Sequence, residues 1–398
     1  MDALQNEKQS QKLAALLSKV QSQTVNDEFI YGVTDRSHRT FAQKVNDFLI
    51  DRSSIPLKER GYFFELLATM IRAGISLVQS VKILRTKTEN QRLRRVIATI
   101  AYELEHGKQF SQTLERFPDV FSDSERGIIR SSEATGNLEQ SLFKIAGNIE
   151  RQDGLRSRLI GAMIYPVAVL IALFASIAVI LGLVVPRMQT LFAENAIQQP
   201  TLTKIFIGAS VWFTHYWWVI FILIIFAIIG FHVYTHSDEG RFSWDFHKLR
   251  IPIIGRLLRS VYVLRFVDSL GLLVESGLPI NKALEYVANT IGNEVYRHKT
   301  YEALASVQMG EPLSLTLLRA PFLFPETVSN MIAIAEQSAT IGEISLKVGV
   351  HYQREIDNTL KQLTTVLGPL MILVIGVAVA FFAIAILSPI FNLAQTVQ

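Results

Sequence analysis

Three apolar runs constrain the fold of this chain more than any other feature. Residues 159–186 contain no ionisable side chain, residues 205–231 contain only His215, and residues 362–398 contain none. Each run is longer than the roughly 20 residues that an α-helix needs to cross a hydrocarbon core about 30 Å thick. The sequence therefore predicts three transmembrane helices, and the first lies too far along the chain to be a cleaved signal peptide.

The positions of lysine and arginine around these runs predict their orientation, because basic residues concentrate on the cytoplasmic side of a membrane. The basic residues nearest the start of the first run and the end of the second are Arg151, Arg156, Arg158, Arg241, Lys248, Arg250, Arg256 and Arg259. Only Arg187 and Lys204 lie between the first two runs, and none follows the third. We expect the N-terminus and the long middle segment to be cytoplasmic, and residues 187–204 and the C-terminal tail to be external.

Composition agrees with a membrane protein and removes several classes of site. Charged residues are 19% of the chain and apolar residues 49%. The chain has no cysteine, which excludes disulfides, zinc–thiolate sites and iron–sulfur clusters. The net charge of +4 follows from the basic residues on the cytoplasmic side, so no nucleic-acid partner is needed to explain it.

The chain repeats itself after 203 residues without a gap. Identical pairs include Phe63 and Phe266, Leu67 and Leu270, Gly74 and Gly277, Gly107 and Gly310, Glu133 and Glu336, Pro166 and Pro369, and Pro186 and Pro389. A register that holds over about 120 residues indicates a duplicated unit, a soluble block followed by a span. The extra middle span returns the chain to the first side of the membrane, so the repeats are predicted to be parallel.

Helical periodicity within each block is interrupted at glycines. Apolar residues at helical spacing end at Gly74, in RAGISL, and at Gly277, in ESGLPI. Glycine after such a run is typical of a left-handed cap, because it lacks a Cβ atom. Ser76 is then placed to cap the next helix, and Gly107 and Gly310 end further helices. We interpret RAGISL as a helix–turn–helix corner, which we favour over a binding loop.

The predicted fold class is an all-α membrane protein with two duplicated cytoplasmic six-helix bundles and three transmembrane helices. The expected organisation is an N-terminal tail and amphipathic helix (1–55), a first cytoplasmic helical domain (56–158), a span (159–186), an external loop (187–204), a second span (205–234), a second cytoplasmic helical domain (235–361), a third span (362–390) and an external tail (391–398). Phe41, Val45, Phe48 and Leu49 form one apolar helical face, which we expect to pack on the first block or on the membrane surface.

The two copies differ at two places. Gly136 aligns with Ala339, so the second copy is expected to turn differently there, with Gly342 supplying flexibility. The first copy alone carries a basic cluster, which consists of Lys82, Arg85, Lys87, Arg92, Arg94 and Arg95. This cluster is either a solvated or lipid-facing surface, or a docking site for an acidic partner.

Motifs of enzyme chemistry are absent. The sequence has no GxxxxGK[ST] phosphate loop, no GxSxG and no HExxH, so we expect no nucleotide hydrolysis, cofactor or catalytic metal. His232 and His236 have metal-ligand spacing, but a plain helix end at a membrane interface explains them better. Glu133 and Glu336 are related by the repeat, which favours a shared structural role, such as an ion pair, over an acid–base pair.

Apart from His215, which we expect near an interface, the three apolar runs also lack the ionisable groups that an ion path requires. Pro166 and Pro369 should kink their helices or lie in their first turns. Small residues in the first and third runs allow close helix packing, although ordinary span composition explains them equally well.

The repeated motifs resemble one known family. FxxxLATMIRAGISLVQSVKIL and FVDSLGLLVESGLPINKALEYV open the two blocks, GxxFSxTLxRFPxxF and GxxLSxTLxRAPxxF follow, and EATGNL lies at residues 133–138. Together these segments, within residues 56–392, are similar to the type II secretion F family of inner-membrane proteins of type II secretion and type IV pilus machines. Residues before 40 do not match, and the region of Ala339 and Gly342 departs from the usual glycine of the second copy.

The resemblance implies a non-enzymatic platform in the bacterial inner membrane. Its implied partners are a cytoplasmic assembly ATPase, pilin or pseudopilin subunits, other inner-membrane assembly proteins, membrane lipids and further copies of itself. The platform would couple the motor to the insertion of pilin-like subunits into a filament. A membrane permease component that receives an ATPase through its cytoplasmic domains is the competing interpretation.

Overall fold

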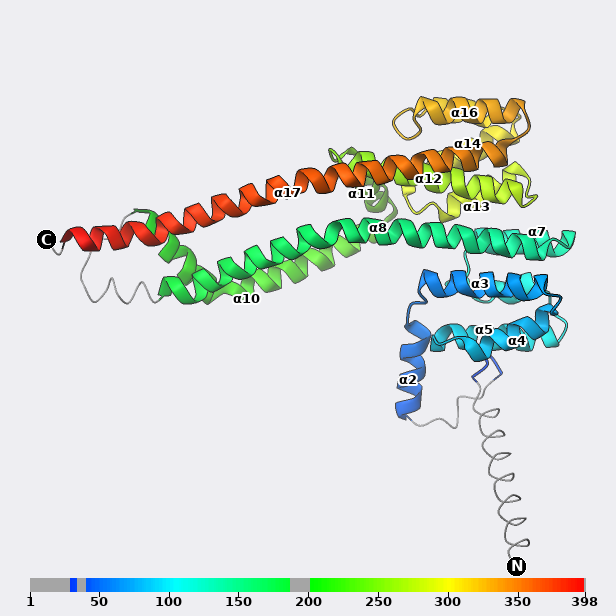
Figure 1. The fold of residues 1–398 in the computed structure, drawn as a ribbon, viewed down its shortest axis with the longest axis horizontal. Helices are drawn as coiled ribbons and strands as arrows, with labels where there is room; N and C mark the ends of the chain where they lie inside the picture. The colour runs from blue at the N-terminus through cyan, green and yellow to red at the C-terminus, as the bar shows by residue number, and fades with distance from the viewer. Residues whose placement is uncertain (1–28, 34–40, 187–200, 397–398) are drawn as a thin grey trace, which may run out of the picture.

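The computed structural model describes residues 29–33, 41–186 and 201–396, and these residues form helices and turns without a strand. Figure 1 shows two groups of short helices at one end of the molecule, from which the long helices α8, α10 and α17 run together to the other end. Both groups therefore lie at the same end of the long helices, as parallel repeats require. The prediction of an all-helical protein is confirmed.

The first repeat is a layered set of helices around an apolar core. Its helices are α3 (Leu57–Arg72), α4 (Leu77–Lys87), α5 (Gln91–Glu105), α6 (Phe110–Glu115), α7 (Asp123–Thr135) and α8 (Leu138–Val179). Phe64, Phe110 and Phe121 are fully buried within it. The rings of Phe64 and Phe121 meet edge to face with centroids 5.7 Å apart, a favourable arrangement for aromatic pairs.

The second repeat has the same helices in the same order. They are α12 (Ile254–Glu275), α13 (Ile280–Thr290), α14 (Glu294–Gln308), α15 (Leu313–Leu318), α16 (Glu326–Gln337) and α17 (Ile341–Thr396). From α4 and α13 onward, each equivalent pair of helices begins 203 residues apart. The internal repeat read from the sequence is therefore also a repeat of structure.

The predicted caps and turns form as expected. The Ser76 hydroxyl accepts from the Gln79 amide, as predicted. Ser122 and Glu125, whose spacing in the sequence is also typical of a capping box, close one on α7. Gly74, Gly107, Gly277 and Gly310 all have φ between 83° and 85°, the left-handed conformation that favours glycine. The helix–turn–helix corners at Gly74 and Gly277 are confirmed.

The expected difference at Ala339 is wrong. Ala339 takes φ 55° and Gly136 takes φ 74°, so both copies turn through a left-handed residue. Gly342 supplies no flexibility, because it lies within α17 against α12, where a Cβ atom on it would come 2.7 Å from Cγ of Glu275. Gly342 instead permits close packing of α17 on α12.

The long helices carry each repeat into an apolar segment without a break. Among the described residues, α8 and α17 are long and apolar enough to cross a membrane, and a third span exists if α10 (Thr201–His236) is counted with the bent helix that follows it. The boundaries at 158 and 361 fall inside α8 and α17, and α17 continues beyond residue 390 to Thr396. A π-helical turn, Ile180–Val184, follows α8.

Pro166 and Pro369 both lie far inside these long helices, so neither is a first-turn proline. Pro166 is buried and Pro369 is exposed. Two predicted segments, the N-terminal tail before residue 29 and most of the loop 187–204, lie outside the described residues.

A short helix precedes each repeat at the end nearest the long apolar segments (Figure 1). Helix α2 (Phe41–Arg52) packs on α5, and α11 (Asp238–Arg250) packs on α14, the equivalent of α5. The chain bends by 103° between α10 and α11. The repeat therefore extends to a preceding helix, which the sequence comparison missed.

Helix α2 contacts the first repeat through its polar face rather than through its apolar face. Arg95 of α5 forms ion pairs with Asp47 at 2.6 Å and Asp51 at 3.3 Å. Val45, Phe48 and Leu49 are 42%, 60% and 61% exposed. The apolar face of α2 is consequently left uncovered.

Candidate functional site

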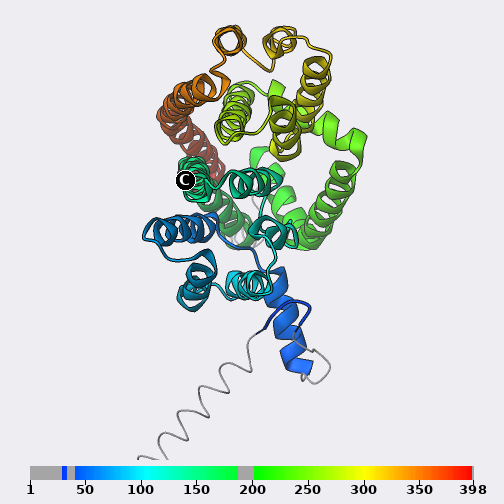
Figure 2. The same ribbon diagram turned by 90° about the vertical axis from the view of Figure 1, so that its right-hand side faces the viewer.

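A cleft of about 500 Å³ lies between the two repeats and is lined by polar and apolar side chains of both. Its walls come from α3, α7 and α8 of the first repeat and from α12, α13 and α17 of the second. Figure 2 views the molecule along its long axis and shows the two groups of helices stacked one above the other, with α8 between them. The cleft is thus a product of how the repeats pack.

Helix α8 contributes the largest share of polar side chains. Asn148, Arg151, Gln152 and Arg156 follow one another at helical spacing and line the same side of the cleft. The apolar run begins at residue 159, within one turn of Arg156. The cleft therefore lies at the end of the repeats that is nearest the apolar segments.

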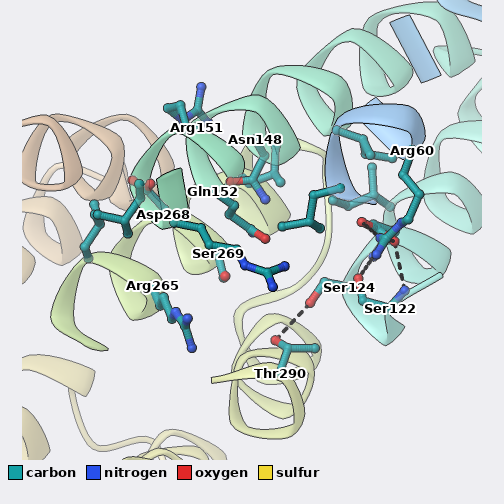
Figure 3. A pocket seen from close by; sticks show the side chains of 18 of the residues that line it. Arg60, Ser122, Ser124, Asn148, Arg151, Gln152, Arg265, Asp268, Ser269 and Thr290 are labelled. Carbon is teal, nitrogen blue, oxygen red and sulfur yellow. Dashed lines mark hydrogen bonds and ion pairs between the residues drawn. The ribbon is translucent and has the colours of Figure 1, made fainter. Parts of the chain in front are cut away.

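One side of the cleft is closed by a buried ion pair. Nη2 of Arg60 on α3, which is labelled in Figure 3, lies 2.5 Å and 2.6 Å from the two carboxylate oxygens of Glu125 on α7. Both side chains are nearly buried, at 15% and 10% exposure. Glu125 also accepts from the Ser122 amide at 2.8 Å, so one carboxylate joins α3 to the start of α7.

Asp268 of α12 provides a second carboxylate on the opposite side of the cleft. Burial raises the pKa of Asp268 to about 6, against the opposing attraction of the Arg151 guanidinium. Gly349 of α17 faces this carboxylate, and a Cβ atom there would collide with it. Asp268 is therefore held between α12 and α17 at the edge of the cleft.

Next to the cleft, α7 of the first repeat packs directly on α12 and α13 of the second. Gly127 lies beneath the Tyr286 ring, and a Cβ atom on it would be 2.5 Å from that ring. The hydroxyls of Ser124 and Thr290 are 3.3 Å apart. Closer to the apolar segments, Arg158 of α8 pairs with Asp357 of α17 at 3.1 Å. These contacts join the repeats into one body.

The basic cluster of the first repeat is divided by the fold. Arg95 is 13% exposed and holds α2, with its guanidinium 4.3 Å from the Phe29 ring. Arg92 pairs with Asp119 and Lys82 pairs with Glu105. Three of the six residues are therefore engaged by carboxylates of the first repeat and of α2.

The remaining members of the cluster are placed differently. Lys87 and Arg94 are exposed and Arg85 is half-buried. Arg94 donates to the backbone oxygens of Thr88 and Glu89. An acidic partner would reach Lys87 and Arg94 far more easily than Arg92 or Arg95.

Glu133 and Glu336 share a structural role, but that role is not an ion pair. Glu133 accepts from the amides of Phe110 and Ser111, at 2.7 Å and 3.1 Å, at the start of α6. Glu336 accepts from Leu313 and Ser314, at 2.5 Å and 3.1 Å, at the start of α15. A carboxylate there satisfies free amides and opposes the positive end of the helix.

Metal and catalytic sites find no support among the residues that the structure describes. No three side chains of the ligating types His, Asp and Glu converge there. His232 and His236 stack on one face of α10, and Nδ1 of His236 lies 2.8 Å from the His232 carbonyl. The cleft offers mainly N–H donors, which suit an anion.

Comparison with known families matches both repeats. The model of type II secretion system (T2SS) protein F matches residues 63–186 and again residues 266–389, which together exceed half of the chain. The chain belongs to this family. The two matched ranges are offset by the same 203 residues as the helices.

Curated members of the T2SS protein F family are similar over most of their length. The type IV pilus assembly protein PilC of Thermus thermophilus is 32% identical over 86% of this chain and 84% of its own. PilC of Pseudomonas aeruginosa is 30% identical over 84% of this chain and 90% of its own. The type II secretion system protein F of the same organism is 28% identical over 83% of this chain and 82% of its own.

In this member of the family, sequence reasoning missed the cleft residues. Arg60 is far from Arg265 and Asp268 in the chain, and these residues line one cleft only because the repeats stack. A signal was nevertheless available, since the register places Val263 opposite Arg60, Tyr62 opposite Arg265 and Thr359 opposite Arg156. Each of these arginines is present in only one copy, which is the same asymmetry that marks the basic cluster.

Proposed function

We propose that this chain is the inner-membrane platform protein of a type IV pilus or type II secretion machine. Membership of the T2SS protein F family supports the assignment, as do relatives named for both kinds of machine. The basic residues around the apolar segments support a cytoplasmic N-terminus and an external C-terminus. Helix α10 would be the second span along the chain and would return the chain to the cytoplasm.

The observation that carries this proposal is mechanical continuity. Both repeats lie at the same end of the long helices and contact each other through α7, α12 and α13. Helices α8 and α17 continue from the repeats into the apolar segments and pack on each other. A displacement applied to the cytoplasmic face would thus reach the membrane through rigid helices. A cytoplasmic assembly ATPase would apply it, and pilin-like subunits would receive it.

The exposed part of the basic cluster is the proposed contact with the ATPase. Lys87 and Arg94 are exposed, so acidic side chains of a partner can reach them, whereas Arg95 is held in an ion pair with Asp47 of α2. We expect Lys87→Glu with Arg94→Glu to weaken retention of the ATPase by the purified protein most strongly at low salt, because rising salt screens the attraction that the wild type offers. Arg297→Glu, at the position equivalent to Arg94, is the control. Equal retention by both variants would refute this contact.

Gene deletion with complementation tests the function itself. We expect a deletion strain to lose its surface filament or its secreted substrates, and the intact gene to restore them. The topology is tested in the same strain with a phosphatase that is active only outside the cytoplasm. We expect activity when it is fused after Gln398 and none when it is fused after Gly240. A deletion strain that keeps all filaments and secretion would refute the platform assignment.

A further inference from the structure

Three arginines at the cleft form no ion pair with a residue that the structure describes. Arg151 and Arg156 form no ion pair or side-chain hydrogen bond with any residue that the structure describes. Arg265 reaches only the Ile291 carbonyl at 3.3 Å and the Tyr262 ring. By contrast, Arg60, Arg72 and Arg158 each pair with a carboxylate. Asp268 partly offsets the charge of Arg151, whereas Arg156 and Arg265 form no ion pair with a described residue, so positive charge is in excess at this cleft.

Buried donors at the same cleft are also unpaired. Nε of Arg60 and Nε2 of Gln353 are both inaccessible to solvent and have no hydrogen-bond partner. Both residues line the cleft, one from each repeat. Buried N–H groups without a partner are rare in native proteins, because the loss of hydration is not offset. Both walls of the cleft therefore carry a donor that no acceptor of the described residues satisfies.

The two carboxylates at the cleft do not cancel these charges. Glu125 is fully engaged by Arg60 and by the first turn of α7. Asp268 is withdrawn toward α17, where it contacts Gly349. Figure 3 shows Asp268 and Arg60 at opposite sides of the view, with Gln152 and Ser269 between them.

The duplicated fold does not require this set of charges. The register places Tyr62, Thr359 and Val263 opposite Arg265, Arg156 and Arg60, so in each case the other repeat folds without an arginine at that position. The basic lining is therefore a property of the cleft between the repeats. Its place within one turn of the apolar run, on α8, puts it at the depth of phospholipid headgroups in the proposed membrane orientation.

We propose that the cleft between the repeats binds a phosphate group, carried either by an anionic phospholipid or by a soluble ligand. Arg156 and Arg265 supply the charge from the two repeats, and the amide of Gln353 supplies a further donor. Guanidinium groups suit phosphate because they present paired donors to its oxygens. A bound phosphate would bridge α8 and α12, and so strengthen the contact between the repeats.

Native mass spectrometry of the full chain in a neutral detergent tests the lipid arm. Equal amounts of phosphatidylglycerol and phosphatidylcholine are added, and we expect one phosphatidylglycerol to be retained in preference. Arg156→Gln with Arg265→Gln should weaken its retention about tenfold or more, since two charge-assisted contacts are lost. Arg156→Lys with Arg265→Lys keeps the charge and should keep most of the binding.

The matched control removes two arginines that lie outside the cleft. Arg354, the register equivalent of Arg151, and Arg241 are both exposed, and neither forms an ion pair with a described residue. Arg354→Gln with Arg241→Gln should leave phosphatidylglycerol retention within about twofold of the wild type. Circular dichroism verifies that all variants fold, and the single variant Arg265→Gln replaces the double variant if that protein does not.

Inorganic pyrophosphate tests the soluble arm in the same detergent. A rise in the Tm of the wild type that the cleft variant lacks and the control keeps would assign the site to a soluble phosphate. A response to phosphatidylglycerol alone would assign it to lipid. If neither probe binds, or if cleft and control variants lose binding equally, the proposal is wrong. Because these measurements need no filament, they are independent of the assignment as a platform.

Discussion

Ala339 occupies a left-handed conformation in which its Cβ atom is unfavourable. Its φ is 55°, and the equivalent residue of the first repeat is Gly136 with φ 74°. An L-residue other than glycine costs about 1 kcal/mol in this region of the backbone. The second repeat therefore keeps the turn of the first at the expense of local strain.

Reciprocal substitutions should reveal this strain. We expect Ala339→Gly to raise the Tm of the purified protein and Gly136→Ala to lower it, each corresponding to up to about 1 kcal/mol of unfolding free energy. Thermal melts followed by circular dichroism measure both changes. A decrease in Tm for Ala339→Gly would mean that the loss of chain entropy outweighs the relief of strain.

Asp268 should make stability depend on pH. Its pKa in the folded protein, about 6, lies above the usual value of 3.8. As pH rises, Asp268 therefore loses its proton in the unfolded state before it does so in the folded state. The stabilisation that neutral Asp268 gives the folded state is full below about pH 4 and is lost as pH rises to about 6. We expect Asp268→Asn to be more stable than the wild type at pH 7.5, on the order of 2 kcal/mol, and nearly equal at pH 4. A stability difference that does not change with pH would contradict the raised pKa.

At the scale of elements, α2 and α11 are equivalent helices that lie across the direction of the long helices. Each packs on the corresponding helix of its repeat, α5 or α14. Each also leaves apolar side chains exposed near the apolar segments, such as Phe48 and Leu49 on α2 and Phe242 and Trp244 on α11. Short amphipathic helices of this kind lie in the headgroup layer with the apolar face toward lipid.

A cysteine-free chain allows this arrangement to be tested directly. We expect a single Leu49→Cys, labelled with an environment-sensitive fluorophore in vesicles, to emit at shorter wavelength than the exposed control His106→Cys on the far end of α5. Quenchers attached to lipid tails should quench only the first. Equal emission and quenching at the two positions would show that α2 stays in water.

At the scale of the whole molecule, the packing of one repeat on the other creates the cleft and joins both spans to a single body. The Ser124 and Thr290 hydroxyls, 3.3 Å apart, mark this contact on α7 and α13. Their register equivalents are Thr327 on α16 and Lys87 on α4. Figure 1 shows these two helices on opposite sides of the stacked repeats. The contact is therefore asymmetric, and each repeat uses a different surface.

A disulfide across this contact should form without distortion. We expect Ser124→Cys with Thr290→Cys to oxidise within one chain, since cysteine side chains at this separation can bridge, and Thr327→Cys with Lys87→Cys to give no such product. Gel mobility with and without reductant measures this. If the repeats act as one body, the oxidised protein should still support filament assembly or secretion, and loss of assembly that reductant restores would show that the repeats must separate.

Local features of this fold followed from the sequence, because caps, turns and helical periodicity depend on residues close together in the chain. Gly74, Ser76 and the Ser122–Glu125 capping box are of this kind, and so is the 203-residue register. The roles of Glu133, Gly342 and Arg95 did not follow, because each is set by a helix that contacts it from elsewhere in the repeat. The sequence by itself determined an all-helical duplicated membrane protein. Only the tertiary structure decided which charges pair and which remain free at the cleft, because that depends on how the two repeats stack.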